Sequence, residues 1–199
     1  MVFPTLVTGA LAGWSLIVAV GPQNAFLLRQ GLQRRHVGPV VTICAVADCL
    51  LILAGNLGVG VLITALPWLI DVLRWGGAAY LGYFAWQSFR SAMRARGLQA
   101  DGHAQGLAAV VAATLTITFL NPGVYLDTVA LLGTLAHQAD HAWSFSVGAM
   151  AASVIWFVGL GYGARALAPL VASRRAWQVV DVIIGVVVLA LAIRLVMGL

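Results

Sequence analysis

The sequence predicts an all-α integral membrane protein with six transmembrane helices, arranged as two inverted three-helix repeats with helix breaks in spans one and four. Three observations lead to this prediction. The 199 residues are 62% hydrophobic and only 9% charged, far below the roughly 25% charged residues of soluble domains. The arginines gather in alternate loops, and two proline-containing polar motifs interrupt apolar segments.

Six apolar segments are each long enough to cross the membrane, since about 20 helical residues span about 30 Å of hydrocarbon. They are residues 3–27, 38–64, 67–89, 107–132, 143–164 and 177–198. The chain then forms one membrane domain, residues 1–199, which its longest hydrophilic stretch divides into repeats at residues 1–99 and 106–199. Because each repeat has an odd number of spans, the second inserts in the opposite orientation.

The loop charges predict which way the chain crosses the membrane. All eleven basic residues are arginine, and nine of them fall in the alternate loops 28–37, 90–106 and 165–176. Only Arg74 and Arg194 lie on the other side. The positive-inside rule places the three loops in the cytoplasm and both termini outside. The net charge of +5 therefore reports topology, and no clustered basic face with aromatics suggests nucleic-acid binding.

Two polar motifs break the first and fourth spans. They are Gly21-Pro22-Gln23-Asn24 and Asn121-Pro122-Gly123. Proline removes a backbone donor and clashes with the preceding helical turn, and carbonyls freed within lipid need partners from protein or from a water-filled cavity. The amide side chains of these motifs can repair the break, bind substrate or do both, and the exposed helix ends suit a carboxylate and an ammonium. The pair predicts a substrate site formed by two discontinuous helices.

Two carboxylates are predicted to bind substrate or protons. Asp48 lies well inside the second span, and Asp127 lies about one turn beyond the second break, close to Tyr125, a further candidate. A carboxylate at mid-membrane depth costs about 2.5–3.5 kcal/mol on insertion scales unless it is paired, protonated or hydrated. The alternative is a structural ion pair or a protonated carboxyl bonded to a neighbouring helix. No buried arginine is expected nearby, so the partner cation would come from outside the protein.

Four other charged residues are predicted to be structural. Asp71 and Arg74 lie three residues apart and can form a surface pair on one helix face. Asp181, in the first turns of the sixth span, would complement the helix dipole. Arg194 would extend its guanidinium to the membrane interface.

The sequence offers little support for metal, cofactor or enzyme chemistry. Cys44 and Cys49 form no CxxC motif, all four histidines fall in loops, and no P-loop is present. A membrane-embedded enzyme would need a nucleophile–base set or a metal cluster at membrane depth. The Gly9-x-x-x-Gly13 and Gly159-x-x-x-Gly163 motifs are predicted to pack helices within one chain, while a homo-oligomer stays open.

The segments at residues 21–31 (GPQNAFLLRQG) and 118–128 (TFLNPGVYLDT) resemble the two signatures of the lysine/arginine exporter family (LysE/ArgO type). The surroundings of Asp48 and residues 75–81 also match, and the resemblance covers the whole chain. It implies a bacterial inner-membrane exporter of L-arginine or L-lysine, with a binding or coupling role for Asp48 and Asp127. Gly123 stands where arginine-exporting members tend to have a larger polar residue, which leaves arginine, lysine or a related cation open.

The leading prediction is a secondary transporter that exports L-arginine or L-lysine by proton antiport, with the lipid bilayer, substrate and protons as its partners. Uniport of a cation out of the cell would work against an inside-negative potential, at about 2.3 kcal/mol per 100 mV. The alternatives are export of neutral amino acids or of another small cation. The least favoured are a membrane-embedded enzyme and a purely structural or pore-forming protein.

Overall fold

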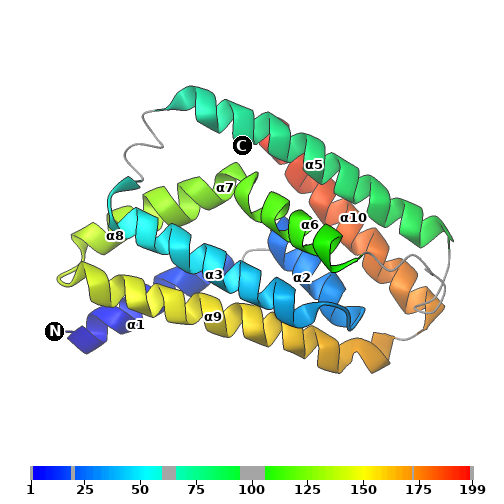
Figure 1. The fold of residues 1–199 in the computed structure, drawn as a ribbon, viewed down its shortest axis with the longest axis horizontal. Coiled ribbons are helices and arrows are strands. Elements are labelled where there is room, and N and C mark those ends of the chain that lie inside the picture. Colours follow the sequence, from blue (N-terminus) through cyan, green and yellow to red (C-terminus); the bar gives the residue numbers. More distant parts are fainter. Residues whose placement is uncertain (1, 19–20, 60–65, 95–105, 172, 198–199) are drawn as a thin grey trace.

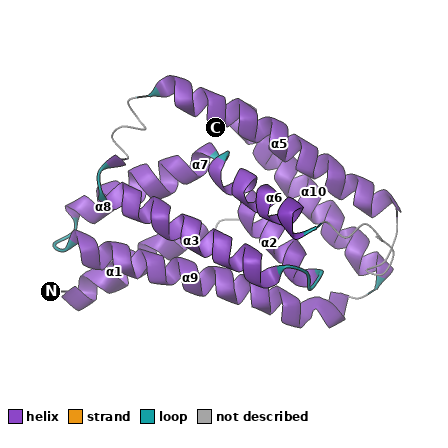
Figure 2. Ribbon diagram, viewed as in Figure 1, coloured by secondary structure: helices purple, strands orange, loops and turns teal. Residues whose placement is uncertain are grey.

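The computed structural model describes residues 2–18, 21–59, 66–94, 106–171 and 173–197. Figure 2 shows helices joined by short turns, with no strand in the described part, so the all-α prediction is confirmed. The elements in chain order are α1 (Val2–Ile17), α2 (Pro22–Leu32), α3 (Val37–Asn56), α5 (Pro67–Arg94), α6 (Leu107–Phe119), α7 (Pro122–Val124), the π-helix η1 (Tyr125–Leu131), α8 (Leu132–Gln138), α9 (Ala142–Leu167), the 3₁₀-helix η2 (Ala168–Val171) and α10 (Arg174–Met197).

Both predicted helix breaks are present. α1 ends at Ile17 and α2 begins at Pro22, while α6 ends at Phe119 and α7 begins at Pro122. The second break bends its helix by 56°. Each proline occupies the first position of the helix that follows, where no intrahelical partner for its missing N–H is needed. A proline that would damage a helix interior therefore starts a new helix.

The span count agrees with the prediction only in part. Three described helices are long and apolar enough to cross a membrane, namely α3, α9 with η2, and α10, and the number rises to five if each bent pair counts as one span. α5 is long enough, at 28 residues, but its four charged residues make it more polar. A six-span arrangement needs α5 as well. The predicted second span, 38–64, continues as α3 only to Asn56, and residues 60–65 lie outside the described part.

The predicted loops are shorter in the structure. α2 continues to Leu32, so the connection to α3 is residues 33–36 and not 28–37, and Arg29 lies within a helix. α5 extends to Arg94, and residues 95–105 lie outside the described part. The connection predicted at 165–176 is mostly helical, through the end of α9 and η2. Helix continues here because polar and charged side chains can reach the interface from the last turn.

The helices form two groups. α9 contacts α1, α2 and α3 and runs through the larger group, which also contains α6–α8, whereas α5 and α10 pack side by side along their length and form the α5–α10 pair (Figure 1). One buried apolar cluster joins the two groups. Leu27, Val40 and Phe157 contribute from the larger group, and Phe84 and Val188 from the α5–α10 pair.

Close helix contact in the larger group depends on glycine. A Cβ placed on Gly9 of α1 would lie 2.0 Å from the carbonyl oxygen of Phe145 in α9, and one on Gly148 of α9 would lie 2.0 Å from that of Leu6. Such distances leave no room for any side chain, so α1 and α9 meet backbone to backbone. The predicted packing within the chain is confirmed for the Gly9-x-x-x-Gly13 motif. It is wrong for Gly159-x-x-x-Gly163, because a Cβ on either glycine would meet none of the described residues within 4 Å.

Candidate functional site

A cavity of about 600 Å³ lies between the two helix breaks, α3, α9 and the α5–α10 pair. Its volume is within the range of small-molecule sites, roughly 300–1,000 Å³. The polar motifs of both breaks line it, although they are about one hundred residues apart in the sequence. The predicted site residues in its wall are Gly21, Pro22, Gln23, Asn24, Asp48, Asn121, Pro122, Gly123 and Asp127. Tyr125 is the one predicted site residue that does not line it.

Asn24 holds the first break together. Its Nδ2 donates to the carbonyl of Ile17 at 2.7 Å, which is one of the last carbonyls of α1 and has no helical partner there. Its Oδ1 accepts from the Trp156 indole N–H of α9 at 3.2 Å. Gln23 is different, because its buried Nε2 has no oxygen or nitrogen acceptor among the described residues, although the side chain lies close enough to the Cys44 thiol to interact with it. A buried donor at a cavity wall is suited to a ligand oxygen.

The second break is also repaired by side chains. Asn121 precedes α7, and its Oδ1 accepts from the backbone N–H of Gly123 at 3.1 Å. The Tyr125 hydroxyl donates to the Phe119 carbonyl, freed at the end of α6, at 2.9 Å. These bonds satisfy backbone groups that the proline leaves without partners. The structure therefore shows that Asn121 and Tyr125 both bond to backbone groups at the second break. A role for them in substrate binding stays a prediction.

Asp48 is the deep charged group of the cavity. It lies on α3, is only 8% exposed, and accepts a hydrogen bond on Oδ2 from the Ser153 hydroxyl of α9. Within the described residues, no basic side chain forms an ion pair with it. A buried carboxylate with one hydroxyl donor retains lone pairs for a further donor. The arrangement can hold either a proton or a cationic group.

Asp127 lies on the π-helix η1, an element that the sequence analysis did not predict. A π-helix has i→i+5 bonds and often occurs at functional sites. Asp127 is exposed and lines the same cavity as Asp48. A bulge of this kind leaves no hydropathy signal, because the apolar pattern of residues 125–131 suits an α-helix equally well.

Two arginines that were predicted to be structural lie in the cavity wall. Arg74 of α5 and Arg194 of α10 both line it, together with Asp71. The predicted surface pair of Arg74 with Asp71 is not present among the described ion pairs. Arg74 instead donates from Nε to the Leu195 carbonyl at 2.8 Å and from a second nitrogen to the Val196 carbonyl. Asp127 lies within the electrostatic influence of Arg194. The sequence did offer a signal for these two residues, because they are the only arginines outside the three predicted loops 28–37, 90–106 and 165–176.

Four charged residues of the cavity wall, Asp71, Arg74, Asp127 and Arg194, define a region that we call the open end. Asp71, Asp127 and Arg194 are exposed and Arg74 is half-buried. Away from the open end, the α5–α10 pair meets α2 through buried apolar side chains. The rings of Phe26 and Phe84 lie 5.8 Å apart there.

The far side of that contact is the closed end, defined by Arg29, Phe84, Ser91 and Asp181. Arg29 of α2 pairs with Asp181 of α10 at 3.5 Å, with side chains 14% and 6% exposed. The Ser91 hydroxyl of α5 donates to the same carboxylate at 2.6 Å, and the Arg29 guanidinium lies 5.9 Å from the Phe84 ring centroid. Asp181 was predicted to complement a helix dipole, but the structure makes it the partner of a buried arginine.

The described residues include no group of three or more histidine, cysteine, aspartate or glutamate side chains placed to hold a metal ion. The polar groups of the cavity are amides, carboxylates, a hydroxyl and guanidinium groups. These groups bind charged and hydrogen-bonding solutes.

Apolar helices, two of them broken around a polar cavity, define a multi-pass membrane transport protein. Residues 14–198 match the family model of the LysE type translocator. The chain belongs to this family, whose members are transporters and not enzymes.

Named relatives cover nearly the whole chain. The lysine exporter LysE of Corynebacterium efficiens is 34% identical over 96% of this chain and 97% of its own length. The arginine exporter protein ArgO of Escherichia coli is 36% identical over 94% and 90%. The putative amino-acid transporter Rv0488 of Mycobacterium tuberculosis is 45% identical over 90% of each chain. No solved structure matches the chain.

Proposed function

We propose that this protein exports L-arginine and L-lysine from the bacterial cytoplasm by exchange for protons. The observation that carries the proposal is Asp48, a buried carboxylate that faces a polar cavity between two broken helices and has no ion-pair partner in the described part of the chain. An intramembrane carboxylate in a cavity is the usual mark of an ion, proton or substrate pathway. Relatives named as lysine and arginine exporters support the substrate class.

Proton exchange follows from the electrical work of export. Moving one positive charge out of the cell against an inside-negative potential costs about 2.3 kcal/mol per 100 mV. Exchange of one leaving cation for one entering proton moves no net charge, so the potential drops out and a pH gradient drives the cycle. Asp48 suits this exchange, because a single carboxylate binds a proton or a cation but not both favourably.

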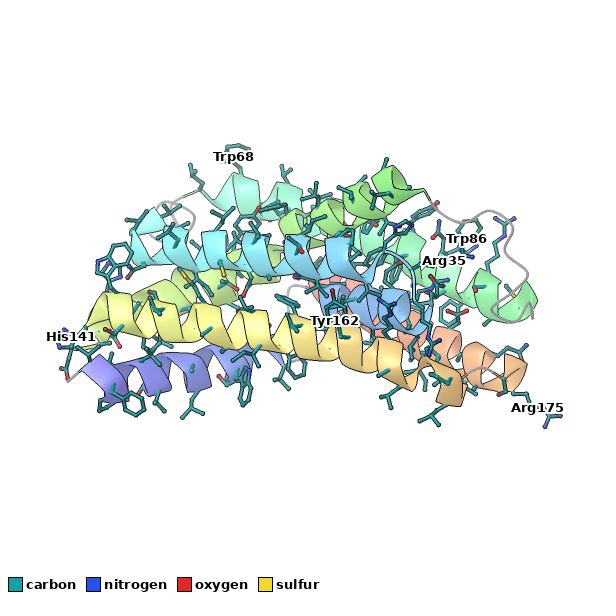
Figure 3. All side chains as sticks on the ribbon, turned by 60° about the horizontal axis from the view of Figure 1, so that its bottom comes forward. Arg35, Trp68, Trp86, His141, Tyr162 and Arg175 are labelled. Carbon is teal, nitrogen blue, oxygen red and sulfur yellow. The ribbon has the colours of Figure 1, made fainter. Side chains whose placement is uncertain are left out.

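The proposal includes a six-span topology with both termini outside the cytoplasm and inverted repeats. It takes α5 and the two bent pairs as spans beside α3, α9 and α10. Two observations support a common side for the arginine-rich turns. Arg34 Nε donates to the Arg165 carbonyl at 3.3 Å, which joins the first and fifth connections, and Figure 3 shows Arg35 and Arg175 toward the end of the molecule opposite His141. With that topology, the open end faces outward.

The test is efflux from proteoliposomes loaded with labelled arginine, lysine, threonine or leucine, held at zero potential with an imposed pH gradient that is acidic outside. We expect arginine and lysine to leave, faster with the gradient than without it. Efflux that ignores the pH gradient and follows an imposed potential would indicate uniport. Efflux of threonine or leucine alone would favour the neutral-amino-acid alternative, and efflux of none of the four would refute the amino-acid substrate class tested.

A further inference from the structure

The open end carries charges of both signs, which a site for a simple cation would not need. Asp71 and Asp127 supply two carboxylates, and Arg74 and Arg194 supply two guanidinium groups. With Asp48 included, three carboxylates face two arginines, which leaves one net negative charge when all are ionised. A basic amino acid carries one net positive charge, so its charge complements that of the whole cavity wall.

The two arginines differ in exposure, since Arg74 is half-buried and Arg194 is exposed. Arg74 spends its Nε and one terminal nitrogen on the carbonyls of Leu195 and Val196, and so fastens α5 to the last turn of α10. Those bonds place the guanidinium of Arg74 beside the turn that bears Arg194. Arg194 is exposed in the cavity wall, in the electrostatic field of Asp127. Arginine presents a planar fork of donors that matches a carboxylate in two parallel hydrogen bonds.

We infer that Arg194 binds the α-carboxylate of the transported amino acid, while Asp48 binds the cation of its side chain. This inference rests on the proposed function and adds the orientation of the substrate. The α-ammonium lies beside the carboxylate in the same molecule, within reach of Asp127. The zwitterionic head exchanges the Arg194–Asp127 attraction for contacts of its own with both groups, so neither charge is left without a counter-charge.

This orientation explains why the cavity has one acid that is buried, Asp48, and another at the open end, Asp127. Asp48 selects for a side chain that ends in a positive charge. The Arg194–Asp127 site selects for the α-carboxylate and α-ammonium of an amino acid. A diamine satisfies the first and fails the second, and a neutral amino acid does the reverse. The outcome is specificity by two separate tests within one cavity.

The experiment compares L-arginine with L-argininamide, which keeps the guanidinium and the α-ammonium but lacks the carboxylate. Binding to the purified protein in nanodiscs is measured calorimetrically at about pH 6.5, where the α-amino group is protonated. The wild type should prefer arginine by about tenfold or more, the usual worth of a charged hydrogen bond. Net charge alone would favour the doubly charged amide, so this preference would not arise from general attraction.

The variant Arg194→Gln should reduce the ratio of the arginine affinity to the argininamide affinity to one or below, because net charge then favours the doubly charged amide. Arg175→Gln is the matched control, because Arg175 lies on the same helix, is exposed, and does not line the cavity. It should keep the wild-type ratio. If Arg194→Gln does not stay folded, Arg194→Lys carries the test. Lysine keeps the charge but loses the fork, and the ratio should fall while staying above one.

The outcomes separate this inference from the proposed function. Wild-type protein that binds arginine and argininamide equally, or an Arg194→Gln variant with the wild-type ratio, would overturn the role of Arg194 and leave basic-amino-acid export standing. Wild-type protein that binds neither arginine nor lysine would overturn both.

Discussion

The two ends of the contact between the α5–α10 pair and the larger group both contain arginine, but they use it differently. At the closed end, Arg29 and Asp181 neutralise each other across two helices, with Ser91 donating to the same carboxylate. At the open end, Arg74 bonds to backbone carbonyls, and Arg194 lines a cavity beside Asp127. An arginine joined to a buried acid holds helices together, whereas one in a cavity wall can receive a ligand. The surroundings, not the residue type, decide the role.

The largest expected effect is at Asp48. Asp48→Asn removes the charge that binds a cation and the group that carries a proton, so export of arginine should be abolished, with binding weakened by at least about tenfold. Proteoliposome efflux and calorimetric binding measure the two losses. Asp140→Asn, an exposed aspartate between α8 and α9, is the control and should behave as wild type. Export by Asp48→Asn at near wild-type rate would make Asp48 a structural residue.

The next effect concerns the closed end. Asp181→Asn leaves Arg29 buried without its counter-charge, and removal of one partner of a buried ion pair typically costs about 3–5 kcal/mol. Arg29→Gln should cost a similar amount, and the double variant should cost much less than the sum. Denaturant unfolding of the purified variants, followed by tryptophan fluorescence, gives the three free energies. Additive losses would show that the two side chains do not interact, and the closed end would then be held by apolar packing alone.

A smaller effect compares the backbone contacts of the two ends. A Cβ on Gly77 of α5 would lie 2.4 Å from the Leu120 carbonyl oxygen at the second break, while one on the neighbouring Gly76 meets nothing within 4 Å. Gly77→Ala should therefore destabilise the protein by about 1–3 kcal/mol, and Gly76→Ala should be neutral or slightly stabilising.

Gly185→Ala provides the corresponding test toward the closed end. A Cβ there would lie 2.8 Å from the ring of Phe89, a side chain that can rotate away, so the cost should be less than that of Gly77→Ala. Thermal unfolding of the three variants ranks them. Equal stability of Gly76→Ala and Gly77→Ala would mean that α5 is free to move away from the break.

The smallest expected effect is at Tyr125. Tyr125→Phe removes the hydroxyl that satisfies the Phe119 carbonyl, at a cost of about 0.5–1.5 kcal/mol. Arginine export should persist if the hydroxyl only repairs the break. A stable variant that has lost export would support the predicted binding role instead.

The features that could be predicted from the sequence are those with a local signal. Apolar length and proline position predict the helices and both breaks, because a proline in an apolar stretch has few other uses, and Asp48 is conspicuous as a charge in a hydrophobic segment. The roles of Arg29, Arg74 and Asp181 were not predictable in this way. Each lies near the end of an apolar stretch, and the partner of each comes from a distant part of the chain. No local pattern encodes which helix arrives beside it.

The composition of the cavity wall has a consequence for biosynthesis. The wall draws on α1, α2, α3, α5, α7, η1, α8, α9 and α10, so it is complete only when helices from both halves have been inserted and have assembled. A ribosome-bound intermediate that has released only the first half into the bilayer presents Asp48 without Ser153, its hydroxyl donor from α9. Such an intermediate lacks the assembled cavity, so the substrate site forms only after the second half has joined the first.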